Sequence, residues 1–470
     1  MERWSSRFGF LLATVGAAVG LGNIWRFSSV LGTNGGGAYL VPYLIAAFLF
    51  AVPLLVLELT VGRSLRTDVV SAFRSVNRAY TVLGWVVVGG VLLILSYYLV
   101  LTGWVFGFFV SWLVGFRTTF SAFTSGWLPV VYFAVVTFVT GAVVSFGVRD
   151  GIERMAKVVM PTVFGLLLVL AVYAFTLAEW GRAFAFLFTP DFSVLTDFGL
   201  WSAAIGQVFF SLSVGQGIML TYGSYIDEET KILRSSVLVT VFDITAALLA
   251  GLVIFPIVFS FGLQPTLGTE LAFTTLPTAF DSMAFGRPVG VAFFGLLFFA
   301  ALSSSVALLE VGVSATTNTT RLGRRRATVL LSGGILVIGV PSALSYSPVR
   351  LFVFGKPFLD IIDESVGTYA LPVSALLIVL VFVWATDIEA VRDELGRLYP
   401  VLRYAVPTVL FVVTVAKVVG VSLPAWRLLI NRSRDGIPSV GVTVAVLIFL
   451  VGLGWLLRAR LPYPRRRRGG

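Results

Sequence analysis

Hydrophobic residues along this chain gather into about twelve long runs, separated by short polar or glycine-rich stretches. A helix needs roughly 20 apolar residues to cross the hydrocarbon core of a bilayer, and most runs reach that length. The pattern therefore predicts about twelve membrane-spanning helices. The runs lie at roughly 8–31, 38–61, 82–115, 127–147, 156–178, 199–225, 235–262, 288–319, 327–345, 366–385, 404–423 and 438–457.

Two of these runs are interrupted by small and polar residues. The first reads ATVGAAVGLGNIWRF from Ala13, with Asn23 and Arg26 inside an apolar stretch, and the sixth contains FSLSVGQG at 210–217. Small residues in membrane helices more often permit close helix packing. Unwound backbone inside a bilayer, however, needs protein or a watery cavity to satisfy its polar groups. Two such breaks, each surrounded by polar residues, favour a transporter binding site at the bilayer midplane.

The spacing of the two breaks predicts internal repeats. Because the sixth run comes five spans after the first, and five is odd, a second unit of five spans would lie upside down relative to the first. We therefore expect an all-α polytopic membrane protein with a 5+5 inverted-repeat core, broken helices 1 and 6, and two appended helices. The expected units are 1–178 and 199–385 for the two repeats, 404–457 for helices 11 and 12, and 458–470 for a basic cytoplasmic tail.

Composition and charge agree with a membrane protein. The chain is 58% hydrophobic and 12% charged, with a mean hydropathy of +0.97, which is not the composition of a soluble enzyme. A net charge of +11 could suggest nucleic acid, but with the N-terminus inside most Lys and Arg residues fall in cytoplasmic loops and the tail. We expect a multi-pass plasma-membrane protein in contact with the lipid bilayer, with both termini cytoplasmic and no nucleic-acid partner.

The chain contains no cysteine and no histidine. These absences exclude a disulfide framework, a thiolate metal site and the usual near-neutral proton relay. The sequence also presents no nucleophile–base set and no metal-binding cluster. We therefore predict that the protein is not an enzyme.

Five segments carry a resemblance to a known family. VGLGNIWRF (19–27) with NGGGAYLVPY (34–43), GQVFFSLSVGQG (206–217), ALSSSVALLE (301–310) and FLDIIDESVG (358–367) occur in order along the chain. They resemble the first two, sixth, eighth and tenth spans of the neurotransmitter:sodium symporter family. The chain is most similar to its prokaryotic amino-acid transporter branch, which includes the bacterial leucine transporter.

The resemblance implies two sodium sites. Sodium is a hard cation that suits carbonyl, hydroxyl and carboxylate oxygens, and unwound helices supply free carbonyls. The first site would use the Ala18 carbonyl, Asn23, Ser211, Asp243 and the carboxylate of the substrate. The second would use the carbonyls of Gly16, Val19 and Ala300 with the hydroxyls of Ser303 and Ser304.

The resemblance also implies an amino-acid substrate, because Gly20 stands where monoamine carriers place an aspartate. Ile94 and Leu308 favour an apolar substrate side chain, whereas Gln216 makes the pocket wider or more polar than a phenylalanine would. The outer gate would pair Arg26 with Asp363, above a lid formed by Tyr98 and Phe210. The implied substrate-binding residues are Ala17, Ala18, Leu21, Gly22, Ile94, Tyr98, Phe210, Ser211, Ser213, Gln216, Ser304 and Leu308.

Two departures from the family pattern bear on mechanism. Asp243 stands where asparagine is usual, which puts a carboxylate beside the first sodium. Chloride-dependent relatives bind their anion near the positions of Tyr43, Gln207, Ser211 and Ala247, and Ala247 offers no hydroxyl. The family's inner gate pair falls on Met1 and Asn318, so it is missing here; Arg3 with another acceptor is the hypothesised substitute. Glu58 and Glu310 are expected to hold unwound backbone or cytoplasmic tyrosines such as Tyr225.

The leading hypothesis is sodium-coupled, chloride-independent symport of a neutral amino acid by alternating access. One alternative is a proton-coupled amino-acid transporter in which Asp243 titrates. Another is a transport-incompetent amino-acid receptor, motivated by the missing inner gate. A homodimer is also left open by the resemblance.

Overall fold

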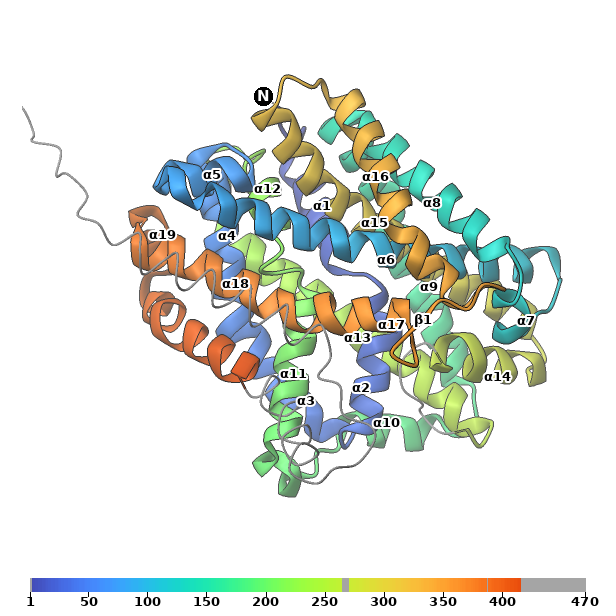
Figure 1. Cartoon of the computed structure of the whole chain (residues 1–470). Helices are drawn as coiled ribbons and strands as arrows, with labels where there is room; N and C mark the ends of the chain where they lie inside the picture. Colours follow the sequence, from blue (N-terminus) through green and yellow to red (C-terminus); the bar gives the residue numbers. More distant parts are fainter. Residues whose placement is uncertain (1, 264–269, 387, 416–470) are drawn as a thin grey trace, which may run out of the picture.

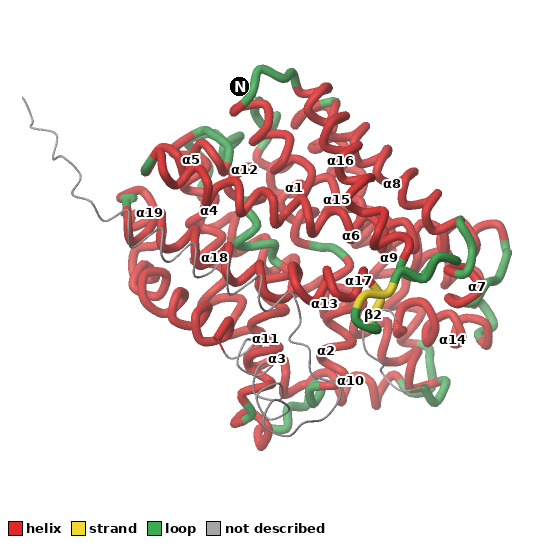
Figure 2. Tube along the Cα trace, viewed as in Figure 1, coloured by secondary structure: helices red, strands yellow, loops and turns green. Residues whose placement is uncertain are grey.

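The computed structural model of the chain describes residues 2–263, 270–386 and 388–415, and nearly all of them are helical (Figure 1). Within these residues the strands are one short hairpin, β1 (Phe352–Val353) with β2 (Lys356–Pro357), in which Phe352 faces Pro357 (Figure 2). The fold is therefore built by helix-on-helix packing, as the hydrophobic runs predict.

Longer helices and short connecting helices alternate along the chain. The helices that form the expected spans are α1 (Arg7–Ala18), α2 (Phe27–Thr33), α3 (Gly37–Ile45), α4 (Val52–Leu65), α6 (Thr81–Val114), α8 (Leu128–Ser145), α9 (Arg154–Phe175), α11 (Phe198–Ser211), α12 (Ile218–Gly223), α13 (Ile232–Ser260), α15 (Gly286–Thr319), α16 (Arg324–Leu344), α17 (Phe358–Ile362) and α18 (Leu371–Val379). The connecting helices are α5 (Val69–Val76), α7 (Phe120–Thr124), α10 (Trp180–Phe188), α14 (Leu276–Ser282) and α19 (Glu389–Leu395).

Tighter or wider helical turns complete the elements. The π-helical segments are Gly22–Arg26, Ala46–Ala51, Val148–Glu153, Leu271–Thr275, Asp363–Ala370, Leu380–Ala385 and Val401–Ala405. The 3₁₀ turns are Arg78–Tyr80, Phe192–Thr196 and Gly396–Leu398. Several π segments join neighbouring helices into one rod, so that α3 and α4 form a continuous helix over Gly37–Leu65.

The number of long apolar helices agrees with a polytopic membrane protein. Eight helices in the described residues are long and apolar enough to span a bilayer, and the number rises to ten if each of two bent helix pairs is counted as one span. The sixth predicted span is the pair of shorter helices α11 and α12. The eleventh predicted run begins within the described residues, whereas the twelfth, at 438–457, and the basic tail, at 458–470, lie outside them.

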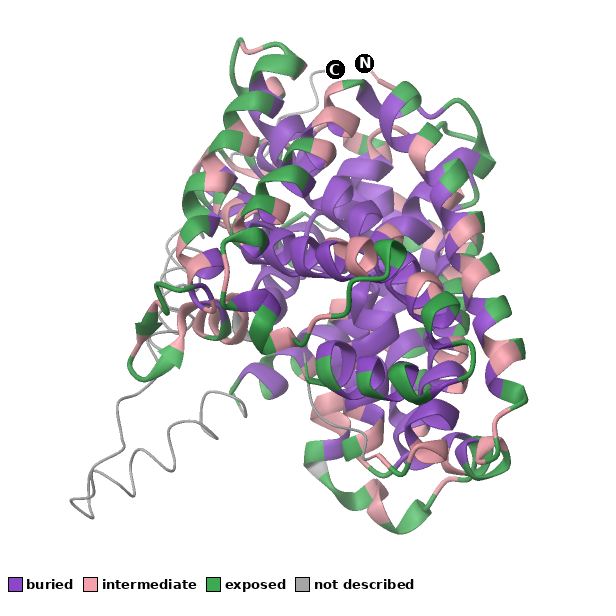
Figure 3. Ribbon diagram, turned by 90° about the vertical axis from the view of Figure 1, so that its right-hand side faces the viewer, coloured by how far each residue is buried: buried purple, intermediate pink, exposed green. Residues whose placement is uncertain are grey.

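Burial separates a central group of helices from a lipid-facing group. In its most apolar stretch α15 is 83% buried, and it packs along α6 and α9. The corresponding stretches of α16 and of Val148–Phe175 are only 33% buried. Large apolar side chains such as Val172 and Val337 are exposed on these outer helices, which Figure 3 shows as the periphery around a buried centre. A bilayer is the solvent that such a surface requires.

The two interrupted spans run antiparallel through this centre. Near the start of the first, Trp4 donates its backbone N–H to the Tyr225 carbonyl (3.2 Å) and its indole N–H to the Tyr222 carbonyl (3.1 Å). Further along, Gln207 in α11 donates to the Gly22 carbonyl at 2.8 Å. The beginning of one span therefore meets the end of the other, as an inverted repeat requires. The division into repeats at 1–178 and 199–385 stays a prediction.

Close backbone contact holds α4 against α12. A Cβ atom placed on Gly62 of α4 would lie 2.0 Å from the Leu220 carbonyl oxygen. A Cβ on Gly223 of α12 would lie 2.6 Å from the carbonyl oxygen of Leu59. Glycine is therefore required on both sides of this contact, as in other membrane helix pairs that approach closely.

The Gly62→Ala substitution should destabilise the protein by about 1–3 kcal/mol, because overpacking forces the two helices apart. The matched control is Gly89→Ala, since a Cβ at Gly89 in α6 would have no neighbour within 4 Å. We expect the control to leave stability unchanged or raise it slightly, because alanine favours the helix. Thermal unfolding of the purified variants in detergent measures both effects; equal midpoints would contradict the packing described for α4 and α12.

Candidate substrate and ion site

The first break lies directly after α1. Val19 adopts extended backbone (φ −76°, ψ 104°), which ends the helix at Ala18. The chain resumes at the π-helical turn Gly22–Arg26, and the two halves are bent by 55°. The Asn23 side-chain oxygen accepts a hydrogen bond from the Gly20 N–H at 3.0 Å. The side chain thereby satisfies a backbone donor at the start of the second half, much as a cap does.

The second break is the loop 212–217 between α11 and α12. Ser213 and Gly215 both adopt positive φ (54° and 79°), which glycine tolerates and serine rarely does. The Ser213 hydroxyl donates to the Ala17 carbonyl at 2.9 Å, so it ties this loop to the first break. Glu58 accepts the Gly215 N–H at 2.6 Å, which confirms that Glu58 holds unwound backbone.

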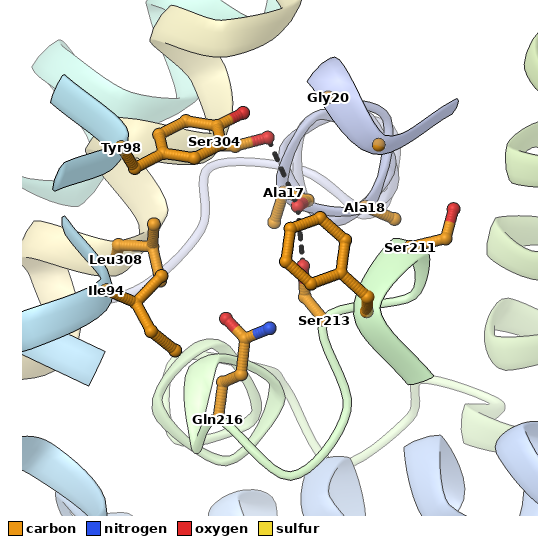
Figure 4. A pocket seen from close by; sticks show the side chains of 12 residues that line it. Ala17, Ala18, Gly20, Ile94, Tyr98, Ser211, Ser213, Gln216, Ser304 and Leu308 are labelled. Carbon is orange, nitrogen blue, oxygen red and sulfur yellow. Dashed lines mark hydrogen bonds between the residues drawn. The ribbon is translucent and has the colours of Figure 1, made fainter. Parts of the chain in front are cut away.

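A cavity lies where the two breaks face each other (Figure 4). Its lining includes every predicted substrate-binding residue except Leu21, which lines the hollow next to it. The described residues that line the cavity include no charged side chain. The lining residues are Ala17, Ala18, Gly20, Gly22, Ile94, Tyr98, Phe210, Ser211, Ser213, Gln216, Ser304 and Leu308.

Gly20 is required by the crowding at one end of this cavity. A Cβ atom there would lie 2.6 Å from the Ser304 hydroxyl and 3.0 Å from the Tyr98 hydroxyl. The Leu21 N–H points toward the same tyrosine oxygen, at 3.4 Å. An aspartate at Gly20 would therefore displace the polar groups that surround the break.

Three of the residues predicted for the first sodium site form one buried cluster beside the cavity. The Asn23 amide donates to the Ser211 hydroxyl (2.8 Å) and to the Asp243 carboxylate (2.6 Å). The Ser211 hydroxyl in turn donates to both oxygens of the Asp243 carboxylate, at 2.9 and 3.0 Å. Ala18, the fourth predicted residue, lines the cavity next to them. The cluster offers hydroxyl and carboxylate oxygens, which suit a hard cation, and the Asn23 amide oxygen lies on the Gly20 N–H beside it.

Four of the residues predicted for the second site also converge, on the other side of α1. The Ser303 hydroxyl lies 2.7 Å from the Gly16 carbonyl oxygen and 3.0 Å from that of Ala300. The Ser304 hydroxyl lies 3.5 Å from the Gly16 carbonyl and 3.4 Å from that of Ala300. Val19 is fully buried at the break itself. These oxygens come from α1 and α15, so a cation bound among them would join the two helices.

A second hollow of about 370 Å³ lies next to the cavity. Tyr98 and Phe210, the predicted lid residues, line both spaces, and their role as a lid stays a prediction. Arg26 and Asp363 line the hollow, but they form no ion pair within 4 Å in the described structure. Instead the Arg26 guanidinium lies 4.2 Å from the centre of the Phe210 ring, a cation–π contact. The pairing of Arg26 with Asp363 stays a prediction.

Sequence reasoning missed how the helices are held together on the side of the molecule where the N-terminus lies. The Trp4 ring packs edge-on against Tyr222 at 5.2 Å between ring centres. The Tyr225 hydroxyl donates to Glu310 at 2.7 Å, as predicted, and Glu310 also pairs with Arg324. In the sequence, Arg324 belongs to a run of arginines that indicates a cytoplasmic loop. The signal that could have identified its structural role is Glu310, because a carboxylate inside a membrane span needs a cationic partner.

Two further contacts close the same side of the molecule. Arg324 also pairs with Glu2 at 3.0 Å. The Arg3 guanidinium lies 3.5 Å from the Asp227 carboxylate, so Asp227 is an acceptor for Arg3, although both side chains are exposed. An exposed pair of this kind contributes little, about 0–1 kcal/mol. Trp4 and the buried Glu310–Arg324 pair therefore stabilise this side of the molecule more than the Arg3–Asp227 pair does.

Comparisons with known proteins agree with this geometry. A model of the sodium:neurotransmitter symporter family matches residues 1–124 and 124–424. The sodium-dependent transporter YhdH of Bacillus subtilis is 37% identical over 391 residues, which cover 80% of this chain and 86% of that protein. A sodium-dependent transporter of Haemophilus influenzae is 30% identical over 447 residues, covering 88% of this chain and 98% of the relative. The crystal structure of MhsT in complex with L-phenylalanine matches with a TM-score of 0.81 and 37% identity, over 88% of this chain and 99% of that one.

These matches confirm the resemblance and the all-α polytopic fold that the sequence predicts. The family match extends from the first residue to 424 and so includes both helix breaks and the cavity between them. The family is one of membrane transporters rather than of enzymes, and the relatives are sodium-dependent. The chain belongs to the sodium:neurotransmitter symporter family.

Proposed function

We propose that the protein couples the uptake of a neutral amino acid to sodium by alternating access, without a requirement for chloride. The observation that carries this proposal is the shared cavity. Both helix breaks line it, and the oxygen-rich residue clusters lie on either side of α1. A substrate in the cavity would therefore contact the same broken segments that would bind the cations.

The polar groups around the cavity suit the two charged ends of an amino acid. The Leu21 and Gly22 amides and the Tyr98 hydroxyl would bind the carboxylate, since N–H groups at the start of a helical segment favour an anion. The Ala18 carbonyl and the Ser213 hydroxyl would bind the amino group, together with the carbonyls of Phe210 and Ser211. The uncharged lining disfavours acidic and basic side chains, because a buried charge needs a partner.

Two sodium ions would be bound by the two clusters. The first would lie among Ala18, Asn23, Ser211 and Asp243, and the substrate carboxylate would complete its coordination. The second would lie among Gly16, Val19, Ala300, Ser303 and Ser304. Because the first ion and the substrate share ligands, each would raise the affinity of the other.

A carboxylate beside the first ion supports independence from chloride. The Asp243 side chain accepts hydrogen bonds from Ser211 and, at 3.5 Å, from the Tyr43 hydroxyl. These two residues are among the positions where chloride-dependent relatives bind their anion. Ala247, a third such position, is fully buried and has no hydroxyl. The fixed charge of Asp243 would therefore offset the cations where an anion otherwise must.

Alternating access would use the hollow above the lid and the closed side opposite. Arg26 would leave the Phe210 ring and pair with Asp363 when the outer side closes, and the contacts of Trp4 and Arg324 would open in turn. We place both termini in the cytoplasm, with the protein in the plasma membrane. The hollow lined by Arg26 then faces the cell exterior.

Purified protein in proteoliposomes should accumulate a neutral amino acid when an inward sodium gradient is imposed. Accumulation should vanish when potassium replaces sodium or when an ionophore dissipates the gradient. A receptor would bind the amino acid without accumulating it. A proton-coupled carrier would accumulate it under a pH gradient in sodium-free medium. Either result would contradict the proposed sodium coupling.

Removing both hydroxyls of the second site should weaken sodium binding. In the Ser303→Ala/Ser304→Ala double variant we expect the apparent sodium affinity to fall by roughly tenfold or more, since each lost polar ligand contributes on the order of 1 kcal/mol. The control is Ser305→Ala, because the Ser305 hydroxyl is also buried but bonds the Ala301 carbonyl of its own helix (2.9 Å). Unchanged sodium dependence of substrate binding in the double variant would reject this site.

Wild-type uptake should be equal in chloride and in gluconate media. The Asp243→Asn variant should bind sodium roughly tenfold more weakly or worse, because a charged contact contributes about 1.5–3 kcal/mol. Adding Ala247→Ser to that variant should create a response to chloride. Asp281→Asn, which alters an exposed carboxylate paired with Arg117, should change neither property. Wild-type uptake that stops in gluconate would show that Asp243 does not replace the anion.

A further inference from the structure

Gln216 is a buried amide at one end of the substrate cavity. Its side chain is 4% exposed and lines the cavity away from Gly20 and Tyr98 in the view of Figure 4. Within the described part of the chain, the Gln216 side chain forms no hydrogen bond. A primary amide carries two N–H donors and a carbonyl acceptor. Such a group is costly to bury unless something in the cavity pairs with it.

The Gln216 backbone has little freedom to withdraw the amide from the cavity. The preceding residue, Gly215, is bound to Glu58 at 2.6 Å. A Cβ on Gly215 would also lie 2.6 Å from that of Ala375, so the loop packs tightly against α18. Two residues before Gly215, the Ser213 hydroxyl is bound to the Ala17 carbonyl. The loop therefore presents Gln216 to the cavity from a fixed position.

Apart from Ser213, whose hydroxyl is bound to the Ala17 carbonyl, the labelled residues nearest Gln216 are apolar. Ile94 and Leu308 lie next to Gln216 in Figure 4 and have no hydrogen-bonding side-chain atoms. The polar groups of the break, near Gly20, would be occupied by the amino and carboxylate groups of the substrate. The side chain of the substrate is then the part that reaches Gln216.

We propose that Gln216 selects neutral amino acids whose side chain carries a hydrogen-bonding group, such as a hydroxyl or an amide. This inference rests on the proposed function, and it changes the expectation of an apolar substrate side chain. A binding site with a buried polar group discriminates strongly against substrates that cannot hydrogen-bond to it, because the buried group is then left without a partner. A charged side chain is disfavoured, since the described lining offers no opposite charge.

Three pairs of amino acids of nearly equal shape test the proposal: threonine with valine, asparagine with leucine, and tyrosine with phenylalanine. Sodium-dependent binding to purified full-length protein is measured for all six. In the pair that contains the tightest binder, the polar member should bind about fivefold more tightly or better. Equal binding, as when a water molecule satisfies the amide, would overturn the proposal.

Two substitutions of Gln216 test whether the preference for a polar substrate side chain depends on this residue. Gln216→Met keeps the length of the side chain and removes its hydrogen bonds, so the preference within that pair should disappear or reverse. Gln216→Leu serves the same purpose if the methionine variant folds poorly. Ile94→Leu, a change of shape in the same apolar region, should alter both members of the pair alike. If both Gln216 variants still bind the polar amino acid more tightly, another residue must form the hydrogen bond to the substrate side chain.

Failure of the inference and failure of the proposed function give different results. If none of the twenty amino acids binds in a sodium-dependent manner, the proposed function and the inference both fail. If apolar members bind with sodium as tightly as their polar partners, the proposed function stands and the role of Gln216 is rejected.

Discussion

The rest of the structure depends on one constraint: backbone polar groups inside a bilayer must be satisfied, even where a helix is broken. The breaks in the first and sixth spans leave N–H and C=O groups free at the centre of the molecule. Side chains from other helices meet that demand, with Glu58 on Gly215, Ser213 on Ala17 and Gln207 on Gly22. Each contact joins helices distant in sequence. The groups that keep the breaks stable therefore also shape the cavity, and the oxygens left over are those available to cations and substrate.

The two ends of this central region differ in how they are closed. On the side of the N-terminus, Trp4 and the Glu310–Arg324 pair fill the space between helices. On the other side, Tyr98 and Phe210 line both the cavity and the neighbouring hollow. Arg26 packs on the Phe210 ring there rather than on a carboxylate. This difference between the two sides supports the alternating access that we propose for this chain.

The sequence predicted the features that depend on local composition. Hydrophobic runs identified the spans, and glycines beside polar residues identified both breaks. Features set by tertiary packing could not be predicted in this way. From the sequence, Arg324 indicates only a cytoplasmic loop, and its pairing with Glu310 is visible only in the structure. The motif FSLSVGQG contains Gln216, but the lack of a hydrogen-bonding partner for this side chain follows from the way the loop packs. Short helices such as α10 and α14 lie outside the spans, where hydrophobic length carries little information.

The central claim is that substrate and sodium occupy connected positions at the two breaks. Sodium binding to the purified protein, measured with radioactive sodium in the presence and absence of a transported amino acid, tests it most directly. The account predicts two sodium ions per chain at saturation with the amino acid present. It also predicts markedly weaker binding of one of them without it, because the substrate carboxylate completes the site of Asn23 and Asp243. Sodium binding of the same number and affinity in both conditions would contradict the account.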